Sequence, residues 1–377
     1  MDVVIVGVGG VGAMAAWRLA AAGHRVTALE QFGIDHDRGS SYGDSRIVRR
    51  VYPDSLYTGL MAHAYRLWDR LMTESGDPSL FVRSGGIFFG PAESDDLRIA
   101  ERALRDSGVP FEILTAPECA RRFPAFRLDA AEAALYEPSM GYARASRAVR
   151  AAVDLARRAG ATVRESAKVI AIEEAGNGVR VRLESAETVS ADRAVLSPGP
   201  WAAPLLQSLG VSLPLRVTRQ PYIHLAPERD EESFQPGIFP VWIDAGANAY
   251  GFPRLGDVPG VKIGIHDFGP DSSPETVDRA VTERDRELAR EYASRRFPAL
   301  SGRSVYEKVC LYTVTPDNDF IVDTVPGFRQ ALMLSACSGH GFKFTPLMGQ
   351  IAADIIGERE TEADLSRFRA SRFRGNE

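Results

Sequence analysis

The chain begins with an apolar, β-branched run at 2–6 that ends in glycines, a pattern typical of a strand buried on both faces. An Ala- and Leu-rich segment at 11–22 follows and predicts a helix, since it stops at Gly23. A second strand-like run comes next, at 25–29. Strand, helix and strand in this order predict a βαβ unit with parallel strands.

Farther along the chain, apolar positions recur at helical spacing in some segments and form short β runs in others. The predicted helices are 55–73, 95–107, 116–122, 147–159, 274–296 and 345–356. The predicted strands are 81–90, 168–173, 179–183, 194–196, 222–225, 241–243, 261–266 and 331–336. Short β runs dominate between about 216 and 307, and the strand-then-helix pattern of the N-terminus returns after 331. We therefore expect a discontinuous first domain with a mainly β domain inserted into it.

Composition and charge narrow the class of protein. A chain of 377 residues suits two domains, and 45% hydrophobic with 25% charged residues is typical of a globular protein. A formal net charge of -5 does not supply the positive field that nucleic-acid binding requires. Three cysteines are too few for a disulfide framework or a Cys-rich zinc site, which favours a reducing compartment. With no secretory leader or membrane-length apolar run, we expect a cytoplasmic protein that binds neither membranes nor nucleic acid.

The glycines after the first strand form a G-x-G-x-x-G pattern at 7–12. Gly7 allows a tight turn, Gly9 lets the backbone approach a pyrophosphate, and Gly12 permits close packing of the helix. Glu30 ends the second strand and can accept a hydrogen bond from a ribose hydroxyl. The pattern predicts FAD or NAD rather than NADP, and it does not distinguish FAD from NAD.

Two polar loops carry further candidate ligand-binding residues. Residues 39–50 form a glycine-broken loop whose arginines could reach a cofactor or an anionic substrate, with a solvated basic loop as the alternative. Residues 338–346 lie between a β run and a helix, and their glycines suit close approach of a ligand. Lys343 stands between two phenylalanines there, an unusual place for a purely solvating lysine. A helix-capping turn is the alternative for this second loop.

Several motifs occur in order over nearly the whole chain. They are residues 7–12, Gly43-Asp44-Ser45-Arg46-Ile47-Val48-Arg49, Gly251-Phe252-Pro253, residues 261–266, Cys310-Leu311-Tyr312-Thr313 and residues 338–344. Together they resemble the monomeric sarcosine oxidase and N-methyltryptophan oxidase family, flavoproteins with a D-amino-acid-oxidase-like fold. The C-terminal motifs are much more specific than the glycine pattern.

The resemblance implies that the cofactor is FAD. Cys310 falls where the family attaches the flavin through a thioether to its 8α-methyl group, and Arg46 falls beside the flavin. The other implied cofactor-binding residues are Ser40, Gly339, His340, Gly341 and Lys343.

The same resemblance implies the substrate site. Arg49 and Lys343 fall where the family holds the substrate carboxylate, a role that a bidentate guanidinium and an ammonium suit. Lys262 falls where a lysine promotes the reaction of reduced flavin with oxygen, since a fixed cation would stabilise developing superoxide. The remaining implied catalytic or pocket residues are His266, Tyr250 and Tyr312.

Two residues depart from the family pattern. Tyr42 stands where a histidine is expected, and Val241, followed by Trp242, stands where a pocket methionine is expected. With Tyr250, these residues are predicted to set pocket volume and polarity, which puts sarcosine itself in doubt as the substrate. We assign structural roles to Cys119 and Cys337.

These observations predict a mixed α/β (α+β) fold with two domains. A Rossmann-like FAD-binding domain is expected at 1–80, 141–215 and 308–377, and a mainly antiparallel β substrate domain at 81–140 and 216–307. We expect a monomeric FAD-dependent oxidase of a secondary amino acid, N-methylated or cyclic, that yields an imine and hydrogen peroxide. The alternatives are an FAD-dependent amine dehydrogenase with another electron acceptor, a redox-inactive dinucleotide-binding protein and, from the glycine pattern alone, an NAD-dependent dehydrogenase.

Overall fold

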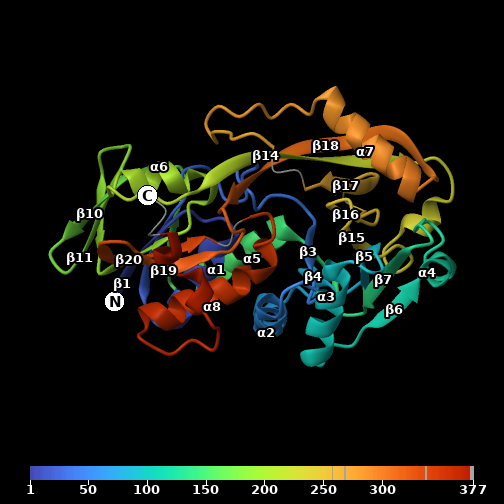
Figure 1. Cartoon of the computed structure of the whole chain (residues 1–377). Coiled ribbons are helices and arrows are strands. Elements are labelled where there is room, and N and C mark those ends of the chain that lie inside the picture. The colour runs from blue at the N-terminus through green and yellow to red at the C-terminus, as the bar shows by residue number, and fades with distance from the viewer. Residues whose placement is uncertain (257, 267–268, 336–337, 374–377) are drawn as a thin grey trace.

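The computed structural model describes residues 1–256, 258–266, 269–335 and 338–373. Cys337, for which we predict a structural role, lies outside the described residues. Two halves are visible on the left and right of Figure 1, each built on its own large sheet.

A six-stranded sheet with the order β19-β20-β13-β1-β2-β9 forms the first half. Its strands are β1 (Asp2–Val6), β2 (Arg25–Leu29), β9 (Thr162–Arg164), β13 (Arg193–Leu196), β19 (Ile321–Val325) and β20 (Phe328–Ser335). Neighbouring strands are parallel except β19 and β20. The predicted βαβ unit is confirmed, with α1 (Gly10–Ala21) between β1 and β2.

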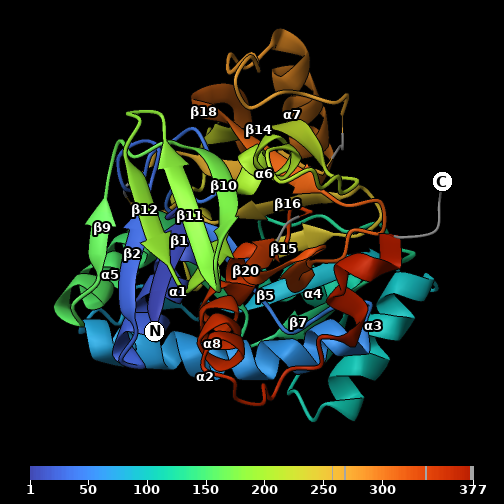
Figure 2. The same ribbon diagram turned by 90° about the vertical axis from the view of Figure 1, so that its left-hand side faces the viewer.

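Both faces of β1 are buried because its side chains alternate between two cores. Val3 and Ile5 join a core formed with α1, α5 (Ala145–Arg158) and α8 (Thr345–Ile356). Val4 and Val6 join a second core on the opposite face. That core includes α6 (Ala202–Gln207) and a three-stranded sheet, which Figure 2 shows over β1 and β2. The small sheet consists of β10 (Val169–Ala175), β11 (Gly178–Leu183) and β12 (Thr188–Ala191).

An eight-stranded sheet with the order β18-β14-β17-β16-β15-β5-β7-β6 forms the second half. Its strands are β5 (Gly86–Pro91), β6 (Glu112–Thr115), β7 (Glu132–Glu137), β14 (Arg216–Pro227), β15 (Val241–Asp244), β16 (Ala249–Phe252), β17 (Val261–Ile265) and β18 (Leu300–Val314). Every neighbouring pair is antiparallel except β15 and β5. An aromatic core lies under α7 (Glu283–Arg296) and α4 (Ala116–Arg122), and α3 (Asp95–Asp106) packs on the opposite face. Cys119 is buried in the aromatic core, as a structural role requires.

Two long strands join the halves. β14 and β18 pair antiparallel from Arg216 opposite Val314 to Pro227 opposite Leu300. In Figure 1 they run along the top of the molecule from one half to the other. The late part of β18 thereby reaches the first half with Cys310 and Tyr312, while its start packs in the core of the second.

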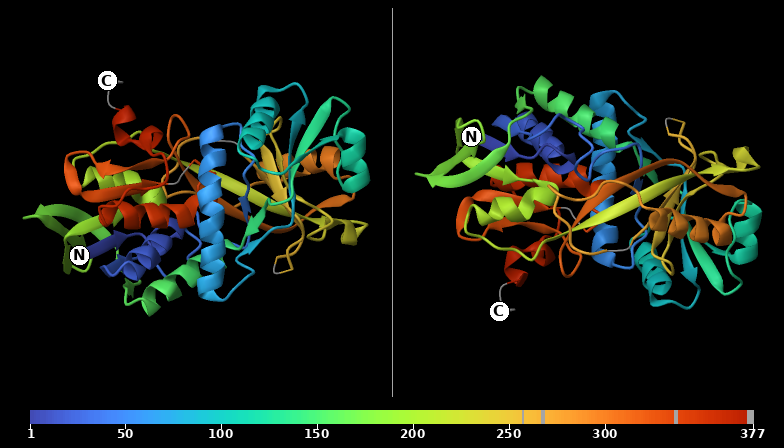
Figure 3. Two further views of the ribbon diagram at one scale, coloured as in Figure 1. Left: turned by 90° about the horizontal axis from the view of Figure 1, so that it is seen from below. Right: turned by 90° about the horizontal axis from the view of Figure 1, so that it is seen from above.

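The long helix α2 (Ser55–Ser75) stands between the halves, as both views in Figure 3 show. In the chain it lies between β3 (Arg46–Val48) and β4 (Phe81–Val82), which pair with the two edges of β8 (Gly141–Ala143) in a three-stranded sheet. The 3-10 turns are η1 (Gly199–Trp201), η2 (Glu231–Phe234), η3 (Phe342–Phe344), η4 (Ser366–Phe368) and η5 (Ala370–Phe373). In the described part of the chain, no helix is both long and apolar enough to cross a membrane.

The mixed fold class with a mainly antiparallel second sheet is confirmed, and some element boundaries differ from the prediction. The predicted strand 81–90 is two strands, because the chain turns at Gly85, whose φ is +75°. The predicted helix 274–296 begins at Glu283, because Thr282 caps it by accepting a hydrogen bond from the Asp285 N–H. The boundaries of the two domains stay a prediction.

Candidate functional site

Two adjoining cavities, of about 370 and 490 Å³, contain the predicted site residues. The first lies at the carboxyl ends of the parallel strands β1, β2, β13 and β20, where open α/β sheets bind ligands. The second lies against the antiparallel sheet and the loop after β3. The residues that line both are Ser40, Arg46, Tyr312, Gly339 and Phe342. A ligand that fills both cavities would therefore pass this shared wall.

The glycine turn of the first cavity has no room for side chains. At Gly7 the φ is +88°, and a Cβ would lie 2.6 Å from the Ser197 carbonyl oxygen. At Gly12 a Cβ would lie 1.9 Å from the Gly7 oxygen, so Gly12 packs α1 onto the turn and does not itself line the cavity. At Gly9 it would lie 3.2 Å from Ser41 Oγ, which accepts a hydrogen bond from the Gly10 N–H at 2.9 Å. These contacts keep bare backbone and the start of α1 at the cavity wall.

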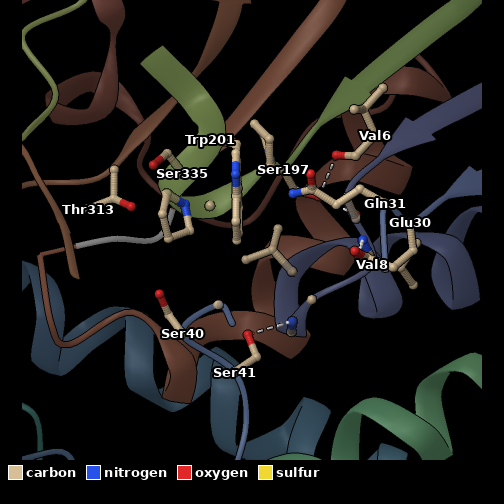
Figure 4. Close-up of a pocket in the computed structure, with 18 of the residues that line it drawn as sticks. Val6, Val8, Glu30, Gln31, Ser40, Ser41, Ser197, Trp201, Thr313 and Ser335 are labelled. Carbon is tan, nitrogen blue, oxygen red and sulfur yellow. Dashed lines mark hydrogen bonds between the residues drawn. The ribbon is translucent and has the colours of Figure 1, made fainter. Parts of the chain in front are cut away.

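Glu30 is buried at the end of β2 and lies with Gln31 at one end of the first cavity, whereas Thr313 lies at the other (Figure 4). It accepts hydrogen bonds from the Val8 N–H at 2.8 Å and the Phe32 N–H at 3.1 Å. Burial raises the pKa of Glu30, but bonds from His36 and these amides lower it more, so the pKa lies below its usual range. The carboxylate is therefore fixed and charged, as binding to a ribose hydroxyl requires.

Arg46 lies at the shared wall, and Cys310 lies beside it in the second cavity. Arg46 Nη2 donates to the carbonyl oxygens of Ser40 and Tyr42, both at 2.8 Å, and lies 3.8 Å from Cys310 Sγ. Ser40 Oγ donates to the Leu311 carbonyl oxygen at 2.6 Å. The polar loop after β2 is thus joined to β18 around the partly exposed Cys310 thiol.

Two cations from opposite ends of the chain face the second cavity. Lys343 is buried, and its Nζ donates to Tyr52 Oη at 2.9 Å and to the His340 carbonyl oxygen at 2.7 Å. Arg49 is half-buried over the Tyr52 ring at 4.1 Å, and its Nη1 donates to the Val51 carbonyl oxygen at 2.6 Å. Among the described residues, neither cation has a carboxylate within ion-pair distance. Burial, together with the charge of Arg49, lowers the pKa of Lys343 well below its usual value.

Aromatic side chains form much of the remaining wall of the second cavity. The His266 ring lies 4.8 Å from that of Tyr250 and 5.5 Å from that of Tyr312. Burial and the charges of Arg49 and Lys343 lower the pKa of His266 to about 4. Burial and Lys343 lower the pKa of His340 to about 3, and its Nε2 lies 3.1 Å from the Asn318 carbonyl oxygen. Both imidazoles are therefore neutral at pH 7.

Lys262 enters the second cavity from β17. It is buried, its Nζ donates to Ser45 Oγ at 3.2 Å, and it lies 4.0 Å from the centre of the Tyr222 ring. Burial and the nearby Arg46 lower the pKa of Lys262 to about 7. Its charge therefore changes near neutral pH.

The sequence profile described as "FAD dependent oxidoreductase" (DAO) matches residues 2–355, nearly the whole chain. The chain belongs to this FAD-dependent oxidoreductase family. It is 36% identical to monomeric sarcosine oxidase of Streptomyces avermitilis over 361 residues, which cover 94% of this chain and 93% of the relative. It is 33% identical to N-methyl-L-tryptophan oxidase of Escherichia coli O127:H6 over 378 residues, covering 99% of each chain. The solved structure of NikD, described as an unusual amino acid oxidase essential for nikkomycin biosynthesis, matches 98% of this chain and 96% of its own, with a TM-score of 0.86 and 26% identity.

The residues of the first cavity fit the FAD of this family. Its turn offers backbone to a pyrophosphate, and Glu30 offers a carboxylate to a ribose. Two threonine hydroxyls in the same wall, Thr313 Oγ1 and Thr345 Oγ1, are buried without a hydrogen-bond partner among the described residues. Since buried polar groups are nearly always hydrogen-bonded, these hydroxyls indicate that a polar ligand belongs here.

The structure brings together the predicted site residues of this FAD-dependent oxidoreductase. The first cavity is lined by Gly7, Gly9, Glu30, Ser40, Arg46, Gly339 and Gly341. The second is lined by Arg49, Tyr250, Lys262, His266, Cys310, Tyr312, His340 and Lys343. The roles that the resemblance implies for these residues stay predictions.

The prediction that Val241 and Trp242 shape the substrate pocket is wrong. Val241 is fully buried in the core beside α3, and Trp242 stacks on Tyr292 in the aromatic core. Ile243, two residues after Val241, lines the cavity instead. Tyr42 lies against Lys308, whose Nζ is 4.1 Å from the ring centre, and is not among the described lining residues of either cavity.

Tyr52 is the main site residue that sequence reasoning missed. It contacts both cations, and its hydroxyl lies 3.3 Å from His340 Nδ1. Phe88, Phe252 and Ser45 also line the second cavity without having been predicted as site residues. An aromatic residue three positions after Arg49 was the available signal, but nothing in the local pattern distinguished Tyr52 from a core residue.

Replacing Gly339 by alanine should destabilise the protein and disturb the site. Gly339 has a φ of +78°, and a Cβ would lie 2.4 Å from the Tyr312 ring. We expect a lower melting temperature, with about 1–2 kcal/mol from the left-handed backbone alone and more from the displaced ring. Gly23→Ala is the matched control, because Gly23 has a φ of +87° with nothing within 4 Å of the added Cβ. Equal melting temperatures for the two variants would show that the Tyr312 contact is unimportant.

Proposed function

We propose that this chain is a flavin-dependent oxidase of a secondary amino acid, N-methylated or cyclic, which releases an imine and hydrogen peroxide. The observation that carries the proposal is the pair Arg49 and Lys343, two cations in one cavity without a carboxylate partner among the described residues. Cations removed from water are costly unless an anion joins them, so the cavity suits a substrate carboxylate. The sarcosine oxidase and N-methyl-L-tryptophan oxidase relatives support the amino-acid class.

The side chains of the second cavity would hold the substrate in one orientation. Arg49 and Lys343 bind its carboxylate, and Tyr52 fixes Lys343 through the hydrogen bond to its hydroxyl. Neutral His266 and the phenols of Tyr250 and Tyr312 enclose the amine, which favours its neutral and reactive form. FAD, when bound, would supply the acceptor for a hydride equivalent from the carbon next to the amine nitrogen and would pass the electrons to oxygen. Water hydrolyses the released imine.

We infer in addition that FAD is attached covalently through Cys310. The thiol lines the second cavity, partly exposed and 3.8 Å from Nη2 of Arg46, which lines both cavities. The monomeric state and the cytoplasmic location that we expect from the sequence stay predictions.

Peroxide release tests the proposed function. The purified holoenzyme is incubated with a panel of N-methyl and cyclic amino acids in air, and hydrogen peroxide is measured with a coupled peroxidase. Peroxide formation with a secondary amino acid, but not with the matching amine that has no carboxylate, is the expected result. Turnover only with an artificial electron acceptor would identify a dehydrogenase, and no reduction of the flavin by any member of the panel would contradict the proposal.

Replacing Lys262 by methionine should slow reoxidation of the reduced enzyme by about a hundredfold or more, the effect of removing one preorganised charge. Flavin reduction by substrate should change by less than about threefold, because the described contacts of Lys262 are with Ser45, Tyr222 and Phe252 and not with the two proposed carboxylate-binding residues. Stopped-flow absorbance measures the two half-reactions separately. Equal loss in both would refute this role.

The same lysine predicts a pH profile. The lowered pKa of Lys262, about 7, means that it is cationic below pH 7 and loses its charge as the pH rises. Reoxidation should therefore slow with rising pH, with a midpoint at or above 7, since negative charge on a neighbouring reduced cofactor would retain the proton. The Lys262→Met variant should lack this slope.

A further inference from the structure

Glu137 is a fully buried carboxylate at the end of β7, outside both cavities. Its Oε2 accepts hydrogen bonds from the N–H groups of Arg50 at 2.8 Å and Val51 at 3.0 Å. Its Oε1 accepts hydrogen bonds from Ser139 Oγ at 2.6 Å and Tyr65 Oη at 3.3 Å. Burial of a carboxylate is costly, and here the hydrogen bonds that offset the cost include two amides directly after Arg49.

The loop between β3 and α2 is held at each of its peptide groups near Arg49. The peptide joining Arg50 to Val51 is fixed at both ends, because its N–H donates to Glu137 and its carbonyl oxygen accepts from Thr58 Oγ1 at 3.0 Å. The next carbonyl, that of Val51, accepts from Arg49 Nη1 at 2.6 Å. A continuous path of hydrogen bonds therefore runs from Glu137 through the backbone to the Arg49 guanidinium.

The ends of this loop are also fixed. Val48 pairs with Gly141 in the small sheet before the loop. Asp54 caps α2 after the loop by accepting from the Leu56 N–H at 2.9 Å. With both ends held, the amides bound by Glu137 decide where the middle of the loop lies. An arginine side chain has many rotamers, so a fixed carbonyl beside its guanidinium restricts it to few of them.

From this geometry we infer that Glu137 is a positioning residue for the carboxylate clamp: it holds the loop that aims Arg49 into the second cavity. The inference rests on the proposed function, since it assumes that Arg49 binds a substrate carboxylate. Glu137 acts by accepting hydrogen bonds from the Arg50 and Val51 amides and does not touch the substrate.

The test compares three Glu137 variants of the holoenzyme. Glu137→Leu has similar bulk and no acceptor, so acetate should bind about tenfold more weakly, as expected for losing hydrogen bonds to a charged group. KM for an amino-acid substrate should rise by a similar factor, while kcat at saturation changes by less than about threefold. Glu137→Gln should restore acetate binding to within about twofold, because its amide oxygen can take the place of Oε2. Acetate affinity is measured by calorimetry, which does not depend on turnover.

A control variant separates an effect on the position of Arg49 from an effect on the stability of the whole protein. Glu132→Leu removes a partly buried carboxylate of the same strand, one that bonds to Arg296 and not to the loop between β3 and α2, so it should lower the melting temperature and leave acetate affinity unchanged. If Glu137→Leu does not fold, Glu137→Asp replaces it, because a carboxylate one methylene shorter cannot reach both the loop amides and Ser139.

Each result supports or overturns the inference. Unchanged acetate affinity in Glu137→Leu or Glu137→Asp would overturn it, as would a Glu137→Gln variant as weak as Glu137→Leu. Arg49→Gln identifies a failure of the proposed function itself: if acetate binds equally well to that variant and to the unaltered protein, Arg49 is not a carboxylate clamp. If Arg49→Gln weakens acetate and the Glu137 variants do not, only the inference about Glu137 fails.

Discussion

Replacing Lys343 by methionine should lower kcat/KM for an amino-acid substrate by about a thousandfold, equivalent to ~4 kcal/mol. Lys343 is buried, and the proposed substrate carboxylate would receive one of its hydrogen bonds in addition to those from Arg49. Methionine keeps the length of the side chain but removes the charge. The substrate carboxylate would then lose one of the two cations proposed to bind it, and only Arg49 would remain. Steady-state kinetics across a wide range of substrate concentrations measures the effect.

Lys308→Met is the matched control for this loss of charge. Lys308 is a partly exposed lysine on β18 that pairs with Asp37 at 2.9 Å, away from the second cavity. Its replacement should change kcat/KM by less than about twofold, since exposed ion pairs contribute little. A reduction of less than tenfold in the Lys343 variant would mean that the carboxylate binds elsewhere.

Replacing Cys310 by serine should release the flavin from the polypeptide. If the proposed thioether forms, acid precipitation of the unaltered protein leaves the yellow colour in the pellet, and the serine variant leaves it in the supernatant. Serine keeps the size and place of the thiol on β18, so FAD should still bind before precipitation. The visible spectra of pellet and supernatant report the outcome.

Cys119→Ser provides the comparison, because Cys119 is buried in the aromatic core of the second half. Its flavin should stay with the pellet, as in the unaltered protein. Colour in the supernatant of the unaltered protein would contradict covalent attachment, although FAD binding itself would stand. Colour in the pellet of Cys310→Ser would place the bond at another residue.

The features that sequence reasoning predicted correctly are those that backbone geometry imposes locally. Gly7 and Gly12 leave no space for a Cβ, and β1 alternates between two cores, so both features leave a plain pattern in the sequence. The features it missed depend on which part of a strand or loop meets the cavity. Val241 and Ile243 share a face of β15, yet only Ile243 lies far enough along the strand to line the cavity.

Contacts between residues far apart in the chain could likewise not be predicted from the sequence. β18 was not predicted, because Gly302 and the charged pair Glu307 and Lys308 interrupt its apolar pattern while β14 supplies the missing support. Glu137 looked like any other acidic residue, since its partners lie 86 and 87 positions away along the chain. Burial of a charge becomes evident only when the fold is known.

The pairing of β14 with β18 has a mechanical consequence. Cys310 and Tyr312 sit on the same ladder whose other end is anchored in the core of the second half. The two halves are therefore joined by a ladder of backbone hydrogen bonds, which limits how far Cys310 and Tyr312 can move relative to the cavity walls on β15, β16 and β17. The side chains on β15, β16 and β17 that line the second cavity can accordingly be redesigned for another amine without moving Cys310 and Tyr312 on β18.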